Sequence, residues 1–151
     1  MMDRREFAAS LVALGALLPV EAEGQAAQTA KPPAELKQLT SGIFKPSPPK
    51  SGQEGHTSQS FLTGMLAAGN IRLEMHESTQ QPGAPHEEVG THKHSEIWFV
   101  KTGTATLFIN GTEHKMEAGD VGLVCAGDQH WIANGGSTEL SYFVITVGPP
   151  E

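Results

Sequence analysis

Cysteine is almost absent from this sequence, which has a single one, Cys125, among 151 residues. With one thiol, no disulfide bond can form within the chain. The fold must therefore be stabilised by side-chain packing, with a metal ion as the other available cross-link. The segment Leu123–Ala126 around the cysteine is apolar, and from it we predict a small, buried and unreactive thiol.

Positive charge is also scarce. The chain has 10 lysine and arginine residues against 17 aspartate and glutamate residues, and its formal net charge is -7. The basic residues form no cluster beyond the pair Arg4-Arg5. Because nucleic acids and anionic membrane surfaces bind proteins through clustered basic residues, the sequence argues against both as partners. A small-molecule ligand or substrate is the partner that we expect.

Long hydrophobic runs are missing as well. The main apolar stretch, residues 8–20, is too short for a comfortable membrane span, so we expect no span in the mature chain. It follows the charged segment Asp3–Phe7 and leads to small residues around Ala22, which is the pattern of a secretory signal peptide over residues 1–22. The Arg4-Arg5 pair is typical of twin-arginine export signals. We therefore expect an exported protein, periplasmic or secreted.

No segment after residue 35 shows the 3.6-residue period of an amphipathic helix. Residues 23–59 are rich in proline and small polar residues, a composition that predicts an arm or linker. From residue 60 to 148, short β-branched and apolar runs are broken by turn residues about every 8 to 12 positions, as in β-sandwiches and barrels. Asn110-Gly111 between two such runs predicts a tight hairpin. We predict one all-β domain over residues 60–148, a jelly-roll barrel.

Histidine and glutamate side chains are concentrated in one part of this domain. His92 and His94 are two residues apart, so on a strand over residues 90–94 they would share one face, and Glu96 would continue that face. His130 lies in a second apolar segment further along the chain. Imidazole and carboxylate groups together are the ligands of borderline divalent metals, and we predict such a metal site.

The spacing of these residues and their glycines resembles the two motifs of the cupin superfamily, whose members have jelly-roll folds. The resemblance covers roughly residues 60–147. It rests on a glutamate with a glycine seven positions later, and on two glycines that frame a strand before a histidine and an asparagine: Glu96, Gly103, Gly119, Gly127, His130 and Asn134. In cupins two histidines and a glutamate of the first motif and one histidine of the second bind the metal, so the resemblance implies His130 as a ligand.

The first motif is shorter than is usual in that superfamily, because only one residue separates His94 from Glu96. Two assignments follow. In the first, His92 is the second histidine of the motif, Gly90 stands at the position of the first, and the site has three ligands. In the second, a tighter turn lets His92, His94, Glu96 and His130 all bind the metal. The sequence leaves both open.

Four other histidines lie outside these motifs. His86, in the segment before the first motif, is a possible alternate ligand, although a solvated loop histidine beside two acidic residues is the simpler interpretation. The remaining three stand in polar surroundings, and we predict surface positions for His56, His76 and His114.

Trp98 would share the strand face of Glu96, and Phe108 on the next strand would face the same way. We predict that both line a substrate-binding pocket above the metal, with ordinary core packing as the alternative. The expected cofactor is a divalent metal ion, Fe, Mn, Zn, Ni or Cu. Dioxygenase, isomerase and decarboxylase activities all occur on this fold, and the fold does not select among them. The alternative function is a ligand-binding or sensing protein without turnover, and the resemblance also implies a homodimer.

Overall fold

The computed structural model describes residues 35–151, so the predicted signal peptide lies outside the described residues. This part of the chain folds into β-strands alone, and it contains no helix that is long and apolar enough to span a membrane. The strands are β1 (Lys50–Ser51), β2 (His56–Met65), β3 (Arg72–Gln80), β4 (Ser95–Thr102), β5 (Thr104–Ile109), β6 (Thr112–Glu117), β7 (Val121–Val124), β8 (His130–Asn134) and β9 (Leu140–Gly148).

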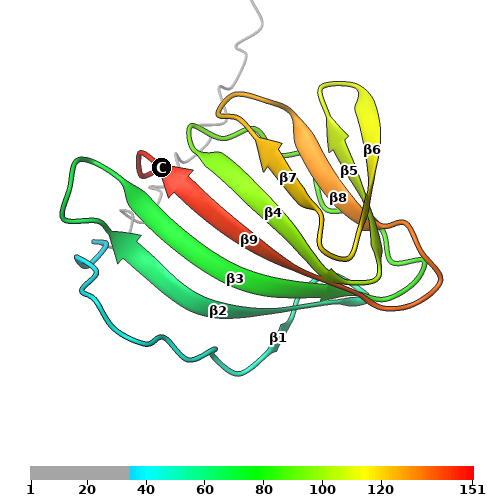
Figure 1. Ribbon diagram of the computed structural model, residues 1–151, viewed down its shortest axis with the longest axis horizontal. Helices are drawn as coiled ribbons and strands as arrows, with labels where there is room; N and C mark the ends of the chain where they lie inside the picture. Colours follow the sequence, from blue (N-terminus) through cyan, green and yellow to red (C-terminus); the bar gives the residue numbers. More distant parts are fainter. Residues whose placement is uncertain (1–34) are drawn as a thin grey trace, which may run out of the picture. The chain divides into compact units, whose positions relative to one another are not determined.

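Two antiparallel sheets form the domain (Figure 1). The larger has the order β1-β2-β3-β9-β4-β7, and the smaller has the order β6-β5-β8. The last strand, β9, pairs with β3 and β4 in the middle of the larger sheet, although both of these strands lie far from it in the sequence. This crossing of strands between two facing sheets is the jelly-roll arrangement, and the predicted all-β fold is confirmed.

The β5–β6 hairpin forms where Asn110-Gly111 predicts it. Asn110 has a φ of 46° and Gly111 a φ of 90°, and β5 and β6 pair in register from Ile109 and Thr112 outward. Positive φ at both central residues is the geometry of a type I′ turn, whose twist matches that of the flanking strands.

The core lies between the sheets and follows the period of two along each strand. On β4 and β5 buried residues alternate with more exposed ones, and β9 follows the same pattern from Tyr142 onward. The buried apolar side chains are Trp98, Val100, Ala105, Leu107, Met116, Val124, Ile132, Leu140, Tyr142 and Val144.

The segment before β1 lies along the edge of the larger sheet. The amide of Leu39 donates to the carbonyl of Met65 at 2.8 Å, and the amide of Met65 donates to the carbonyl of Lys37 at 2.9 Å. Gly64 permits this approach, because a Cβ there would lie 2.5 Å from the Lys37 oxygen. The strands begin at Lys50, so β1 and the start of β2 lie within the segment 23–59 that the composition marks as an arm.

The prediction of a buried thiol is wrong. Strand β7 ends at Val124, and Cys125 begins the turn that leads to β8, where its side chain is exposed. The apolar residues before it explain the difference, because Val121 and Leu123 point to the outer face of the larger sheet and are 63% and 58% exposed. The apolar run therefore predicts the strand correctly, but it does not predict that the side chains are buried.

Candidate metal site

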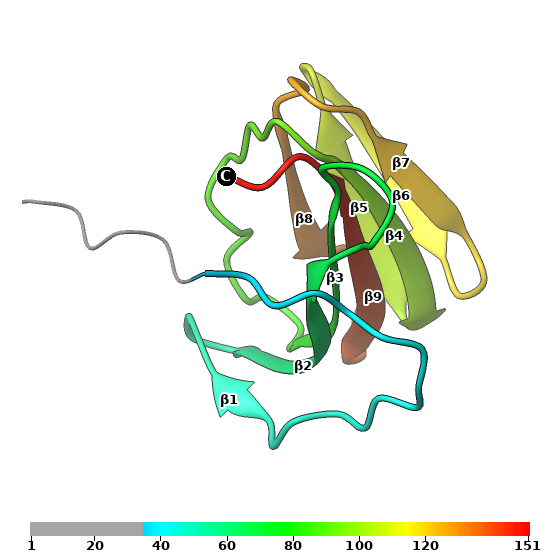
Figure 2. The ribbon, with the colours of Figure 1, turned by 90° about the vertical axis from the view of Figure 1, so that its left-hand side faces the viewer.

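The loop between β3 and β4, residues 81–94, runs beside β8 and takes the place of a further strand of the smaller sheet (Figure 2). The amide of Gly90 donates to the carbonyl of His130 at 2.8 Å, and the amide of His130 donates back at 3.0 Å. The predicted strand over residues 90–94 is wrong, because only Gly90 pairs and the next residues turn away. This single bridge still brings His92 to the start of β8.

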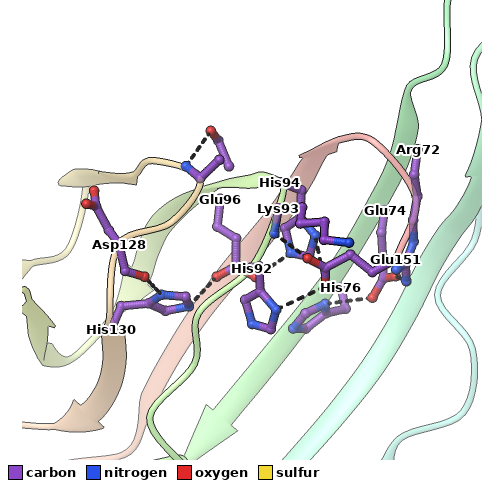
Figure 3. Close-up of polar contacts among 12 residues, drawn as sticks. Arg72, Glu74, His76, His92, Lys93, His94, Glu96, Asp128, His130 and Glu151 are labelled. Atoms are coloured by element: carbon purple, nitrogen blue, oxygen red, sulfur yellow. Dashed lines mark hydrogen bonds and ion pairs between the residues drawn. The ribbon is translucent and has the colours of Figure 1, made fainter.

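Three segments of the chain meet at one cluster. His92 comes from the loop, Glu96 from the inner face of β4 and His130 from the first position of β8, as Figure 3 shows. Each offers one ligand atom, and these atoms all lie within 4.8 Å of one another. Glu96 and His130 are buried, with 8% and 5% of their surface exposed. Buried imidazole and carboxylate groups that converge on one point can hold a metal ion.

Hydrogen bonding orients the ring of His130. Its Nδ1 is 3.1 Å from the carbonyl oxygen of Asp128, which can only accept, so Nδ1 carries a proton. The other nitrogen, Nε2, is 3.1 Å from Glu96 Oε2. A neutral ring would place two electron pairs face to face at this distance, so a proton or a cation must lie between them. A second-sphere carbonyl of this kind fixes the tautomer of metal-binding histidines.

The charges of this pair depend on each other. Contact with the Glu96 carboxylate raises the pKa of His130, against the effect of burial. Burial works to raise the pKa of Glu96, but His130 and the neighbouring histidines outweigh it and hold that pKa below its ordinary value. Glu96 is therefore ionised near neutral pH, which is the form that binds metal ions.

His94 lies beside this cluster without joining it. Its Nε2 is 3.3 Å from Glu96 Oε1, and its ring stacks on the ring of His92 with a centroid distance of 4.6 Å. A Cβ at Gly90 would lie 2.9 Å from His92 Nε2 and 3.1 Å from His130 Nε2, so a side chain at this position would point into the cluster. The geometry favours the first assignment, in which Gly90 stands at the position of the missing histidine.

The structure separates Phe108 and His86 from the cluster. Phe108 pairs with Trp131, and the two rings stack at 5.2 Å on the outer face of the smaller sheet. The prediction that Phe108 faces the same way as Trp98 is wrong, because Leu107 and Ile109 are the inward residues of β5. His86 stacks on Trp131 at 4.6 Å, on the side of β8 opposite to His130, and so does not replace a ligand.

Trp98 lies inside the barrel next to the cluster. It is 3% exposed, its ring meets that of His130 edge-on at 6.1 Å, and it stacks on Tyr142 at 5.6 Å. Its indole Nε1 is buried without a hydrogen-bond partner. Trp98 thus belongs to the core and at the same time forms an apolar wall behind His130.

Sequence reasoning missed a row of polar side chains on β3. Arg72, Glu74 and His76 lie on its inner face, since β9 pairs them with Gly148, Thr146 and Val144. Arg72 forms an ion pair with Glu74, and His76 Nδ1 is 3.6 Å from Glu74 Oε1. The prediction of a surface position for His76 is therefore wrong. The alternation along β3 was visible in the sequence, but its apolar residues face outward here.

A cavity of about 260 Å³ opens between β2, β3 and the 81–94 loop. Its wall is polar, and it is lined by Gly52, Gln53, His56, Thr57, Ser58, His76, Ser78 and Glu87. Glu87 accepts a hydrogen bond of 2.9 Å from the hydroxyl of Tyr142. Strand β9 alone separates β3 from β4, so about 10 Å lies between the backbone of this wall and that of Glu96.

Comparison with known proteins agrees with the jelly-roll fold. The family model for the cupin domain matches residues 76–146. An oxalate-binding protein of Thermotoga maritima is 33% identical over 66 residues, which are 42% of this chain and 54% of that protein. The matched region thus spans about half the length of this relative.

Solved structures resemble the fold. An RmlC-like cupin from Shewanella frigidimarina has a TM-score of 0.56 at 19% identity, covering 69% of this chain and 86% of the other. KdgF from a Halomonas species has a TM-score of 0.58 at 16% identity, covering 74% and 96%. At these identities the likeness concerns the fold alone.

Proposed function

Because this chain carries a cupin domain, we propose that its barrel binds a divalent metal ion through His92, Glu96 and His130 and uses it to hold a small-molecule ligand. The observation that carries the proposal is the meeting of three ligand atoms from three separate segments within 4.8 Å. Imidazole and carboxylate groups that converge in this way can complete one coordination sphere.

The donor set fits a borderline metal. Two imidazoles and one carboxylate suit Fe, Mn, Zn, Ni or Cu and leave coordination positions free for water or a ligand. The contact between His130 Nε2 and Glu96 Oε2, 3.1 Å apart, requires a proton or a cation between them, and a bound metal ion would supply the cation. When bound, the metal supplies Lewis acidity, which polarises an oxygen atom of the ligand. Trp98 and Asp128 keep His130 in place, one by packing and the other by its carbonyl.

A small carboxylate is the ligand class that we favour. The oxalate-binding relative supports this choice, since oxalate chelates metals through its two carboxylates. The cationic side chain of Arg72 on the inner face of β3 also supports it, although Glu74 balances its charge.

Metal analysis of untagged, full-length protein tests the proposal. We expect close to one equivalent of metal that resists dialysis, and its loss in His130→Ala and Glu96→Gln. His114→Ala is the matched control, because His114 is exposed on β6, and it should keep the metal. Calorimetry with oxalate should then show binding to the metal-loaded protein and none to the metal-free form. Metal retained in both site variants would contradict the proposal.

We also propose that the protein is exported to the periplasm or secreted. The support is the pattern of residues 1–22, with Arg4-Arg5 ahead of the apolar run. Substituting both arginines by lysine should keep the charge and stop twin-arginine export, leaving the precursor in the cytoplasm on cell fractionation. Unchanged export of the lysine variant would argue for a general secretory signal instead.

A further inference from the structure

A second set of ligand atoms converges beside the first. His92, His94 and Glu151 each place one ligand atom within 4.8 Å of the other two. Glu151 Oε2 is 3.3 Å from His92 Nδ1 and 3.8 Å from His94 Nδ1. Glu151 comes from the segment after β9, and it reaches back over the end of the 81–94 loop (Figure 3). Two imidazoles and a carboxylate again form a donor set for a borderline divalent metal.

The ring of His94 lacks a partner on the side that faces Glu151. The side chain is 6% exposed, and its Nδ1 is buried without a hydrogen bond. Its Nε2 lies 3.3 Å from Glu96 Oε1, which can only accept, so the proton of a neutral ring belongs on Nε2. Nδ1 then presents an electron pair to the Glu151 carboxylate. A buried acceptor that faces another acceptor is costly unless a cation lies between them.

Glu151 is held in place for such a cation. The backbone amide of Lys93 donates a hydrogen bond to Glu151 Oε1, which leaves Oε2 turned to the two histidines. This bond is the main reason why the pKa of Glu151 is lowered, so the carboxylate is ionised near neutral pH.

His92 takes part in both clusters through different ring nitrogens. Its Nδ1 faces Glu151, while its Nε2 lies on the side of Gly90 and His130, as the contacts of a Cβ built on Gly90 show. The two nitrogens of an imidazole point in different directions, so one ring can serve two neighbouring sites.

We propose that His92, His94 and Glu151 form a second cation site, for zinc or a chemically similar divalent metal, next to the cluster of His92, Glu96 and His130. This site goes beyond the proposed function, which needs neither His94 nor Glu151. With both sites filled, His92 is coordinated through both nitrogens and must release its ring proton. The second metal therefore binds more weakly than the first, and its binding releases the ring proton of His92.

Zinc titration of the metal-free full-length chain tests the proposal. We expect two equivalents of unequal affinity. Binding of the weaker one should release the ring proton of His92, which is measured in two buffers of different ionisation enthalpy. Glu151→Gln keeps the size of the side chain but removes its charge, and it should weaken the second equivalent by at least about tenfold and spare the first. Glu117→Gln is the matched control, because Glu117 is an exposed glutamate on β6, and it should change neither. Circular dichroism verifies that each variant is folded.

The outcomes separate this site from the first. A single equivalent that survives Glu151→Gln and is lost in Glu96→Gln overturns the second site and leaves the proposed function intact. Two equivalents that both survive Glu151→Gln overturn it as well. Loss of one equivalent in Glu151→Gln, with both retained in Glu96→Gln, supports the second site and contradicts the first. No zinc binding at all contradicts both.

Discussion

Trp98 offers a direct optical signal of the metal site, because its ring meets the ring of His130 at 6.1 Å. The chain has two tryptophans, and the other, Trp131, lies on the outer face of the smaller sheet. In Trp131→Phe, all indole emission comes from Trp98. We expect copper(II), which quenches indole fluorescence at short range, to reduce this emission steeply at one equivalent. Adding His130→Ala should abolish the quenching at that concentration, and persistent quenching would place the copper elsewhere.

Glu77 is a buried carboxylate on the outer face of the larger sheet, and it belongs to neither cluster of metal-ligand atoms. It contacts Lys101 and Ser141 at 2.8 and 2.7 Å and accepts a 3.0 Å hydrogen bond from Gln59. Burial works to raise its pKa, but these three contacts together lower it below the ordinary value. A carboxyl whose pKa is lower in the folded state stabilises the fold above its unfolded pKa and ceases to do so as pH falls through the folded value.

We therefore predict a pH-dependent effect of Glu77→Gln. At pH 7 the variant should lose about 1 to 3 kcal/mol of unfolding free energy, as expected when a partner of hydrogen-bonded charged groups is removed. The deficit relative to the unsubstituted protein should shrink as the pH falls through the folded pKa of Glu77, which lies below the ordinary value for glutamate. Urea unfolding at several pH values measures both. An equal deficit at pH 7 and pH 3 would mean that charge plays no part.

Individual residues of the site were predicted unevenly from the sequence, for a physical reason. His130 and Glu96 lie on strands, where the period of two fixes the face of each side chain. His92 and His94 lie in a loop, where no period applies, and their division between two clusters depends on the Gly90–His130 bridge, a contact between distant segments. Glu151 follows the last strand and carried no signal at all.

At the scale of elements, two turn glycines allow a comparison of stability between matched variants. Gly103, between β4 and β5, and Gly111, in the β5–β6 hairpin, have similar φ values of 83° and 90°. A Cβ at Gly111 would meet nothing within 4 Å, whereas one at Gly103 would lie 2.7 Å from the carbonyl oxygen of Glu139. Alanine at either position should cost about 1 to 2 kcal/mol for the left-handed backbone.

Gly103→Ala should cost more than Gly111→Ala, because the clash at Gly103 is with backbone and adds about 1 to 3 kcal/mol. Thermal and urea unfolding of the two single variants give the comparison. Because the cost of the left-handed backbone is common to both variants, the difference between their losses of unfolding free energy measures the clash with the Glu139 carbonyl oxygen. Equal losses would mean that the β9 end of the sheet moves aside at no cost.

The positions of the strands could largely be predicted from the sequence. Which face of each strand points inward could not. The runs that became β4, β5 and β9 are rich in β-branched and apolar residues, and the Asn110-Gly111 turn set the register of one hairpin. On β3 apolar and polar residues do alternate, but the polar side chains of Arg72, Glu74 and His76 face inward and the apolar ones face outward. Periodicity divides a strand into two faces, but which face is inward depends on what the barrel encloses, here a polar cavity beside a cluster of titratable groups.

At the scale of the whole molecule, the homodimer is still a prediction. Apolar side chains lie side by side on the outer face of β4 and β7, where Phe99 pairs with Val121 and Ile97 pairs with Leu123. Phe99, Val121 and Leu123 are exposed, and Ile97 is half-buried. Contiguous apolar surface on a soluble protein often marks an interface. Strand β7 is also an edge of the larger sheet, with unpaired backbone groups that a second copy can cover.

Leu123→Lys should shift the protein from dimer to monomer in light scattering coupled to size exclusion, since a charge at the centre of this surface must be desolvated on association. Val89→Lys is the matched control, because Val89 is 56% exposed but lies in the 81–94 loop, and it should leave the dimer intact. A monomer at all concentrations without any substitution would contradict the homodimer.

Because Cys125 is exposed and is the single cysteine of the chain, it is a site for thiol-specific labelling. It lies two residues before Gly127, whose amide donates a 2.8 Å hydrogen bond to the carbonyl of His92. A nitroxide or a maleimide dye attached there needs no engineered cysteine and sits beside the loop that carries the metal-binding histidines. Its spectrum would follow the local motion of that loop as metal is added. In a dimer, the two labels would also define one intermolecular distance, so the same preparation could be used to measure both local dynamics and assembly.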